Sequence, residues 1–356
     1  MDKTLFDLYT DYLLSSFGPA TATNLSRLVD GAISHDQVTR LLSGEPQRSV
    51  HLWQKVKPLV RAVESPAGVI IIDDSLSEKP YTDENELICW HYDHAQNRTV
   101  KGINFLTALY QVAGVSLPVA FDLVTKTETY LDPKTNREKR RSPVSKNERF
   151  RLLLRVCVQN EIQFSYVLAD LWYASADNMK FVVLGLKKHF VFPLKENRKV
   201  ALSAADQKQG RFVAVSTLDL PAGQTRQIWL EEVPFPLLLT KEVFTNKDGS
   251  TGVRYLVTDD LTLSYDQIIK LFQRRWRIEV YHESLKQHAS LEKSPTRTET
   301  TQRNHFFASL CAYVKLESLK IKTGVNHYAL KSKIYLAALK TAYQELVKLE
   351  PISLGA

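Results

Sequence analysis

One charged segment in the second half of the chain restricts the fold more than any other feature. Residues 263–287 contain neither glycine nor proline, and Ser264 followed three positions later by Gln267 is typical of an N-terminal capping box. The segment therefore predicts one long helix. Apolar residues recur in it every seven positions and form a seam that can pack on a core: Leu271, Ile278 and Leu285.

A second stripe of this helix carries mixed chemistry. At about 100° per residue, four side chains fall within roughly 60° of one another: Phe272, Arg275, Glu279 and Lys286. An ordinary explanation is a solvated face with an i,i+4 pair between Arg275 and Glu279. A cleft that binds phosphates is the other explanation, because arginine suits bidentate contacts and lysine acts as a point charge.

Two aspartates upstream come at the ends of buried strands. Residues 69–73 form a short apolar strand that runs into Asp74, and the strand at 164–168 ends at Asp170. Such a strand places a carboxylate at the rim of a cleft, although aspartates in strand-end turns are common. Asp73 is adjacent to Asp74, and strand alternation allows only one of the two to face a given side of the sheet.

These segments together resemble the DDE transposases of bacterial insertion sequences, in the branch with a Tyr-x2-Arg-x3-Glu-x6-Lys motif. The motif is matched, with phenylalanine in place of tyrosine, by Phe272, Arg275, Glu279 and Lys286. The resemblance covers about residues 66–310 and includes the runs IIIDDS, WHYDHAQNRTVKGINFLTALYQ and YVLADLWY. The family pattern of an acidic residue, an aspartate and then a hydroxyl residue favours Asp74 over Asp73.

The resemblance implies an α/β fold. Its core is a ribonuclease H-like mixed sheet flanked by helices, with an N-terminal helical domain and an inserted β-rich subdomain. In such a sheet the two aspartates lie on neighbouring strands, and the helix places its carboxylate beside them. The implied catalytic residues, which are also the implied ligands of two Mg²⁺ or Mn²⁺ ions, are Asp74, Asp170 and Glu279. The implied DNA-binding residues are Phe272, Arg275 and Lys286.

The activity implied by the resemblance is transposition of DNA. The enzyme would cut double-stranded DNA at transposon ends and join the freed 3′ hydroxyl to target DNA, as a homodimer in a synaptic complex. Two alternatives use the same residues: a nuclease of this fold that does not join strands, and a catalytically silent DNA-binding protein derived from a transposase. A glycosidase with a carboxylate pair suits the cationic stripe less well.

The overall composition fits a DNA-binding protein. The chain of 356 residues carries 47 lysines and arginines against 39 acidic residues, a net charge of +8 that favours a polyanionic partner. Its apolar runs are far shorter than the ~18 residues of a membrane helix, and no signal peptide is visible. Cys89, Cys157 and Cys311 are far apart, as expected of buried free thiols in a reducing compartment. We expect a cytoplasmic, nucleoid-associated protein.

Changes of pattern divide the chain into five parts. The predicted domains are an N-terminal helical domain at 1–64, a catalytic core in two pieces at 65–189 and 258–310, an inserted β-rich subdomain at 190–257, and C-terminal helices at 311–356. Residues 22–42 have the outline of a helix-turn-helix, which is typical of major-groove readers and of structural hairpins alike.

Three details complete the expectations. The basic segment 126–149 is predicted to be an exposed loop. Trp229 in the insertion either stacks on a flipped base or belongs to the core. His91 and His94 are expected to form hydrogen bonds rather than a metal site, since no cysteine accompanies them.

Overall fold

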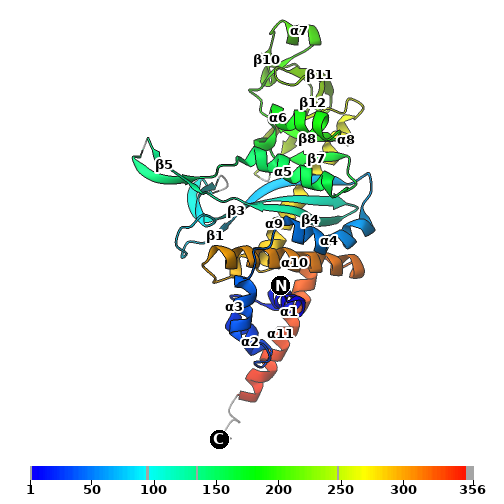
Figure 1. Cartoon of the computed structure of the whole chain (residues 1–356). Helices are drawn as coiled ribbons and strands as arrows, with labels where there is room; N and C mark the ends of the chain where they lie inside the picture. Colours follow the sequence, from blue (N-terminus) through cyan, green and yellow to red (C-terminus); the bar gives the residue numbers. More distant parts are fainter. Residues whose placement is uncertain (1, 94–95, 134, 247, 350–356) are drawn as a thin grey trace.

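A large mixed sheet organises the molecule, seen in Figure 1 as a computed structural model that describes residues 2–93, 96–133, 135–246 and 248–349. His94 lies outside these residues. Strand β1 (Val69–Glu78) is central. It pairs antiparallel with β3 (Arg98–Val112) and parallel with β7 (Tyr166–Ala169). The apolar run at the start of β1 forms a buried strand because both of its faces are covered.

The neighbouring strands complete the core of the sheet. Strand β3 also pairs antiparallel with β2 (Cys89–Asp93) and β4 (Val115–Leu123), and β7 pairs parallel with β8 (His189–Leu194). The order β4-β3-β1-β7-β8 is therefore mixed, with the two aspartate-bearing strands side by side. The predicted α/β fold with a mixed sheet flanked by helices is confirmed.

The strands of residues 190–257 extend this same sheet. Beyond β8 its order is β13-β12-β11-β9-β10. The strands are β9 (Lys199–Ala201), β10 (Val213–Ala214), β11 (Thr225–Leu230), β12 (Leu237–Thr245) and β13 (Thr251–Thr258). Figure 1 shows this part at the end of the molecule farthest from the N-terminal helices, with α7 (Ala204–Lys208) at its tip.

Helices cover both faces of the sheet. On one face lies α5 (Lys146–Gln159), which contacts β3 and β4, and its Phe150 and Leu154 belong to the same core cluster as Ile70 and Ile72 of β1. On the other face lie α8 (Tyr265–Gln273), α9 (Arg277–Gln287) and α10 (Glu299–Thr323). Val69 and Ile71 belong to the core on that side. The side chains of β1 thus alternate between the two faces.

The remaining helices lie at the two ends of the chain. The N-terminal helices are α1 (Lys3–Ser15), α2 (Ala22–Leu28), α3 (His35–Ser43) and α4 (Ser49–Val63). The C-terminal helix is α11 (His327–Leu349). In Figure 1, α10 crosses beneath the sheet, and α1, α2, α3 and α11 lie beyond it. Short elements connect the core: α6 (Ala176–Lys180), a π turn at 181–185, and 3₁₀ turns at 171–173, 215–217 and 291–293.

The structure corrects two local predictions. The capping box of Ser264 and Gln267 is confirmed, but the long helix tightens to a 3₁₀ turn at residues 274–276 between α8 and α9. At this turn Arg274 donates hydrogen bonds to the backbone carbonyls of Gln111 (2.7 Å) and Ala67 (3.0 Å), which tie it to the sheet. In the basic segment, β5 (Glu128–Asp132) and β6 (Arg137–Arg141) form a hairpin instead of a loop.

Cross-strand charges explain that hairpin. Lys139 pairs with Asp132, and the Arg141 guanidinium lies 2.9 Å from Glu128, so opposite charges face each other along the two strands. No helix in the described part of the chain is both long and apolar enough to span a bilayer.

Candidate active-site cleft

A cleft of about 890 Å³ opens where β1, β7 and α9 meet. Its acidic lining residues are Asp73, Asp74, Asp93 and Asp170, and its cationic ones are Lys146, Lys195 and Lys286. Asp73 and Asp74 lie in the middle of β1, which runs on to Glu78 instead of ending at residue 73 as predicted, while Asp93 ends β2 and Asp170 follows β7. The lysines come from α5, from the turn after β8 and from α9. Carboxylates and ammonium groups therefore share one concave surface.

Asp74 is enclosed by hydrogen-bond donors on the α5 side of β1. Lys146 Nζ lies 2.7 Å and Asn104 Nδ2 2.8 Å from its Oδ2, and the Tyr173 hydroxyl donates to Oδ1 at 2.7 Å. Burial acts to raise the pKa of Asp74, but the Lys146 ammonium and these hydrogen bonds outweigh it, and the pKa lies below its ordinary value. Asp74 is thus an ionised carboxylate with its partners already in place.

Asp73 faces the opposite side, toward α9. Its Oδ2 lies 3.2 Å from Arg275 Nη1, and its Oδ1 accepts the backbone N–H of Asp74 at 2.8 Å. Burial, and then the charges of Asp74, Glu279 and Asp170, raise the pKa of Asp73 to about 8 against the lowering effect of Arg275. Three other carboxylates are therefore close enough to Asp73 to raise its pKa.

Arg275 joins the strand to the helix. Its Nη2 lies 3.1 Å from Glu279 Oε1, so one guanidinium bridges the carboxylates of Asp73 and Glu279. The predicted i,i+4 pair is present, and it faces the sheet. Glu279 itself is 38% exposed and lies in the first turn of α9, where the helix dipole favours a negative charge.

Asp170 lies at the end of β7. Because Ile72 and Ala169 are register partners in the parallel pair of β1 and β7, the next residues, Asp73 and Asp170, lie side by side. The Asp170 carboxylate accepts the backbone N–H of Leu171 and caps the following 3₁₀ turn. Its side chain is exposed and lines two adjoining cavities.

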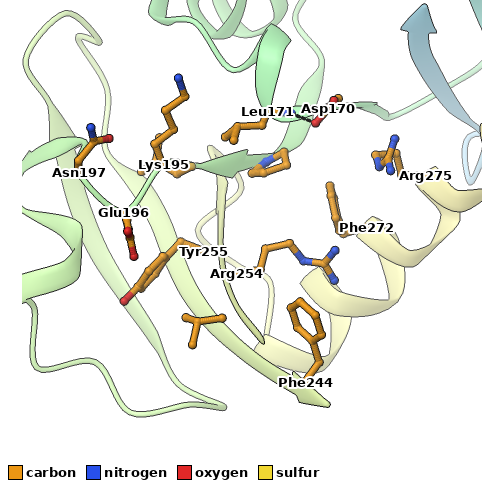
Figure 2. A pocket seen from close by; sticks show the side chains of 13 residues that line it. Asp170, Leu171, Lys195, Glu196, Asn197, Phe244, Arg254, Tyr255, Phe272 and Arg275 are labelled. Carbon is orange, nitrogen blue, oxygen red and sulfur yellow. Dashed lines mark hydrogen bonds between the residues drawn. The ribbon is translucent and has the colours of Figure 1, made fainter. Parts of the chain in front are cut away.

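The second cavity, of about 630 Å³, lies between Asp170 and the β12–β13 hairpin (Figure 2). Phe272 lines it but is only 4% exposed. The guanidinium carbon of Arg254 is 4.7 Å and that of Arg275 6.0 Å from the centre of this ring. The Phe272 ring thus supports two guanidinium groups by cation–π contacts.

Lys286 lies in the last turn of α9. Its Nζ donates a hydrogen bond to the carbonyl of Leu76 at 2.8 Å and lies 3.6 Å from Glu292. It lines the carboxylate cleft. This agrees with its predicted position on the same stripe of the helix as Arg275 and Glu279.

Sequence reasoning missed three side chains that line the cleft, Asn104, Lys146 and Lys195. It also missed Tyr173, which donates to Asp74, and Arg254, which lines the second cavity. A capping box of Ser145 and Glu148 marks the start of α5, and it could have placed Lys146 in a first helical turn. No local signal connects Lys146 with Asp74, which lies 72 positions away.

Two other predicted features are not among the residues that line the cavities. Trp229 lies on β11 opposite Ala201, half buried, and lines neither of the two cavities. His91 has its pKa lowered to about 3, mainly by burial and also by Lys126 and Lys146, so it is neutral.

The donor atoms of the cleft are of the type that Mg²⁺ and Mn²⁺ prefer, since carboxylate oxygens are hard ligands. Within the described ranges, no three His, Cys, Asp or Glu side chains are arranged around one ion position. Here Arg275 and Lys146 supply the positive charge that Asp73, Glu279 and Asp74 require. The carboxylates are therefore chemically suited to bind divalent ions. In this structure their negative charge is balanced by Lys146 and Arg275.

Comparison with known families gives two matches. A family model described as DDE superfamily endonuclease matches residues 2–211, and one described as transposase DDE domain matches residues 142–315. Comparison with curated proteins gives no match.

Two solved structures align with parts of the chain. One is the Drosophila P element transposase strand transfer complex, at 16% identity and a TM-score of 0.23, covering 46% of this chain and 33% of that one. The other is the catalytic domain of human endonuclease V, at 11% identity and a TM-score of 0.25, covering 68% and 98%. The chain thus spans about a third of the P element transposase.

Proposed function

We propose that this chain, which belongs to the DDE superfamily endonucleases, is a transposase of the bacterial insertion-sequence branch that cuts transposon ends and joins them to target DNA. Membership of the family makes it a nuclease-type enzyme. The observation that supports the finer proposal is the single cleft in which carboxylates from β1 and β7 lie beside a lysine rim and next to the Arg275–Glu279 pair.

The proposed catalytic residues are Asp170, Glu279 and one aspartate of β1. They would hold two Mg²⁺ or Mn²⁺ ions, which when bound supply activation of a nucleophile and stabilisation of the leaving oxygen in a displacement at phosphorus. The family pattern favours Asp74 as the third ligand. The contacts favour Asp73, because it faces α9 and shares Arg275 with Glu279, whereas Asp74 is held by Lys146.

The phosphates next to the scissile bond are assigned to cationic side chains. Arg275 and Lys286 on the catalytic helix would bind them, joined by Lys146 and Lys195 from the facing walls of the cleft. Phe272 would act on DNA through the two guanidinium groups that its buried ring supports. The partners are double-stranded DNA and a second copy of the chain, at the nucleoid in the cytoplasm.

A strand-transfer assay tests this function. Labelled transposon-end DNA is incubated with the protein, a supercoiled plasmid and Mg²⁺ or Mn²⁺. Joined products are expected from a transposase, whereas cleaved ends without joining identify the alternative nuclease. Binding without cleavage identifies a silent DNA-binding protein and contradicts the proposal.

Glu279→Gln tests the role of the helix carboxylate. We expect cleavage to fall by at least about a thousandfold, because a neutral amide is a poor ligand for Mg²⁺, while the mobility shift of end DNA is retained. Glu283→Gln is the matched control, since Glu283 lies one turn later on α9 and is exposed. Full activity of the Glu279 variant excludes this assignment.

Two further variants decide between the adjacent aspartates. If Asp73 is the ligand, Asp73→Asn removes the rise in melting temperature that Mg²⁺ produces, and Asp74→Asn retains most of it. The reverse result assigns the ligand to Asp74. This readout is independent of catalysis.

A further inference from the structure

The carboxylate of Asp74 already accepts three hydrogen bonds. Lys146 Nζ and Asn104 Nδ2 donate to its Oδ2 at 2.7 and 2.8 Å, and the Tyr173 hydroxyl donates to its Oδ1 at 2.7 Å. An ionised carboxylate has about four lone-pair positions, so about one is left. A divalent ion bound there would lie next to the Lys146 ammonium, and two cations at that distance repel each other. The contacts of Asp74 therefore suit a role other than that of a metal ligand.

Separate elements fix the donors around Asp74. The Tyr173 ring stacks on Phe150 of α5 with 5.3 Å between the ring centres, and the 3₁₀ turn that carries Tyr173 is capped by Asp170. Asn104 lies on β3, which pairs with β1. Asp74 is therefore held from the neighbouring strand and from the turn after β7, without help from Lys146. A carboxylate held in this way can in turn fix the position of a flexible lysine side chain.

Lys146 occupies a place that helix stability does not explain. It is the first residue of α5, directly after the N-cap Ser145, where the helix dipole disfavours a cation. Its side chain is 34% exposed and lines the cleft together with Asp73 and Asp170. Among the described residues its ammonium has one hydrogen-bond partner, Asp74, although an ammonium carries three N–H donors. Donors of Lys146 thus remain for a ligand in the cleft.

We propose that Asp74 is a positioning residue for Lys146, and that Lys146 is a catalytic residue that donates to a non-bridging oxygen of the scissile phosphate. The inference rests on the proposed function, in which this phosphate reacts beside the carboxylates of β1, β7 and α9. A fixed ammonium stabilises the negative charge that the phosphoryl oxygens carry in the transition state. Arg275 and Lys286 are then left for the phosphates on either side, and Asp73 for the metal ions.

A double-mutant cycle on the rate of cleavage tests the positioning role. Asp74→Asn and Lys146→Met should each lower kcat for cleavage of end DNA by about a hundredfold, as the loss of one preorganised donor does. The double variant should lie within about threefold of Lys146→Met, because Asp74 acts through Lys146. An ion pair that only joins α5 to β1 would instead lower the unfolding midpoint in urea and leave kcat of the folded enzyme unchanged.

Further variants serve as controls for the cycle. Lys146→Arg keeps the cation and should recover part of the lost kcat, whereas Lys146→Gln, which can keep a hydrogen bond to Asp74 without the charge, should not. Lys195→Met removes another lysine of the cleft. Its effect should add in full to that of Asp74→Asn, because Lys195 is not among the donors to Asp74 in the described part of the chain.

Binding of modified DNA tests the phosphate contact without catalysis. End DNA is prepared with an uncharged methylphosphonate in place of the scissile phosphate, and its affinity is measured by fluorescence anisotropy in EDTA. The wild-type chain should bind it about tenfold more weakly than unmodified DNA, since one charge-assisted hydrogen bond is lost. Lys146→Met should bind the two DNAs equally. A methylphosphonate at a flanking phosphate is the control, to which Lys146→Met should remain as sensitive as the wild type.

The possible outcomes separate this inference from the proposed function. Equal losses from Asp74→Asn with and without Lys146 would overturn the positioning role. A Lys146→Met chain that discriminates against the scissile methylphosphonate as strongly as the wild type would overturn the phosphate contact. Failure of the proposed function gives a different pattern: the wild-type chain cuts ends without joining them, or binds them without cutting, while the effect of Lys146 on methylphosphonate binding is kept.

Discussion

Asp73 has a raised pKa because it is buried next to other carboxylates in the cleft. Its pKa of about 8 lies above the value of about 3.9 in an unfolded chain, so between these values the folded state holds a proton that the unfolded state has lost. Stability without divalent ions should therefore fall as pH rises, by about 2 kcal/mol between about pH 6 and 8. Asp73→Asn should remove this slope, as measured by urea unfolding in EDTA.

The control for this measurement is Asp177→Asn. Asp177 is an exposed carboxylate on α6 beside Lys180, and this variant should keep the wild-type slope. A wild-type protein whose stability does not change over this pH range would contradict the raised pKa.

At the scale of single residues, the sequence predicted which residue types belong to the site better than it predicted which side chains contact one another. The spacing of Arg275 and Glu279 on one helix predicted their ion pair, because helical geometry is local. The enclosure of Asp74 by Lys146, Asn104 and Tyr173 depends on three separate elements that meet only in the folded sheet. Strand alternation predicts that Asp73 and Asp74 point to opposite faces of the sheet, but which face each of them takes became clear only from the partners of β1.

Among the elements, the 3₁₀ turn between α8 and α9 sets the position of Glu279. Arg274 fixes this turn through the side chain and carbonyl of Gln111 and the carbonyl of Ala67. Arg274→Met should lower the free energy of unfolding by about 2 kcal/mol, since hydrogen bonds from a charged donor are lost.

The same variant should reduce kcat more than DNA affinity, because Glu279 is displaced with its helix while Lys146 and Lys195 on the facing walls of the cleft stay in place. Arg277→Met, at an exposed position of α9, is the control and should leave stability and kcat close to wild type. An unchanged unfolding midpoint in urea for Arg274→Met would exclude a fixing role for the turn.

Element types were predictable where the local pattern is strong. The strand 69–73, the capping boxes and the amphipathic helices follow from hydrophobic period and cap chemistry. The hairpin β5–β6 has no apolar alternation, and its stability rests on cross-strand charges, so its composition was typical of a loop. That β9–β13 continue the central sheet depends on edge-to-edge pairing, which periodicity does not encode.

At the scale of the whole molecule, buried histidines make the free energy of unfolding depend on pH in the acidic range. His305 of α10 lies 2.9 Å from the Tyr9 hydroxyl of α1, and burial, with Lys79, lowers its pKa to about 4. The pKa of His282 is lowered to about 3, mainly by burial. Between about pH 6.5 and 4 the unfolded chain binds these protons first, so stability should fall as pH falls, by about 2 kcal/mol per histidine from pH 7 to 5.

His305→Gln should lower the stability at pH 7 and flatten this slope. Chemical unfolding at the two pH values measures both effects. His35→Gln is the control, because His35 is exposed at the start of α3. A slope that is the same in wild type and in His305→Gln would show that the contact between α1 and α10 does not control acid stability.

A buried contact at the start of α11 links the catalytic helix α9 to α10 and α11. Ser284 of α9 lies 2.8 Å from His327 Nδ1, and His327 Nε2 lies 2.8 Å from Glu317 of α10. The helix that carries Glu279 is thus joined to α10 and α11 by three buried side chains. The catalytic helix therefore cannot shift without also moving the two helices that follow it in the chain.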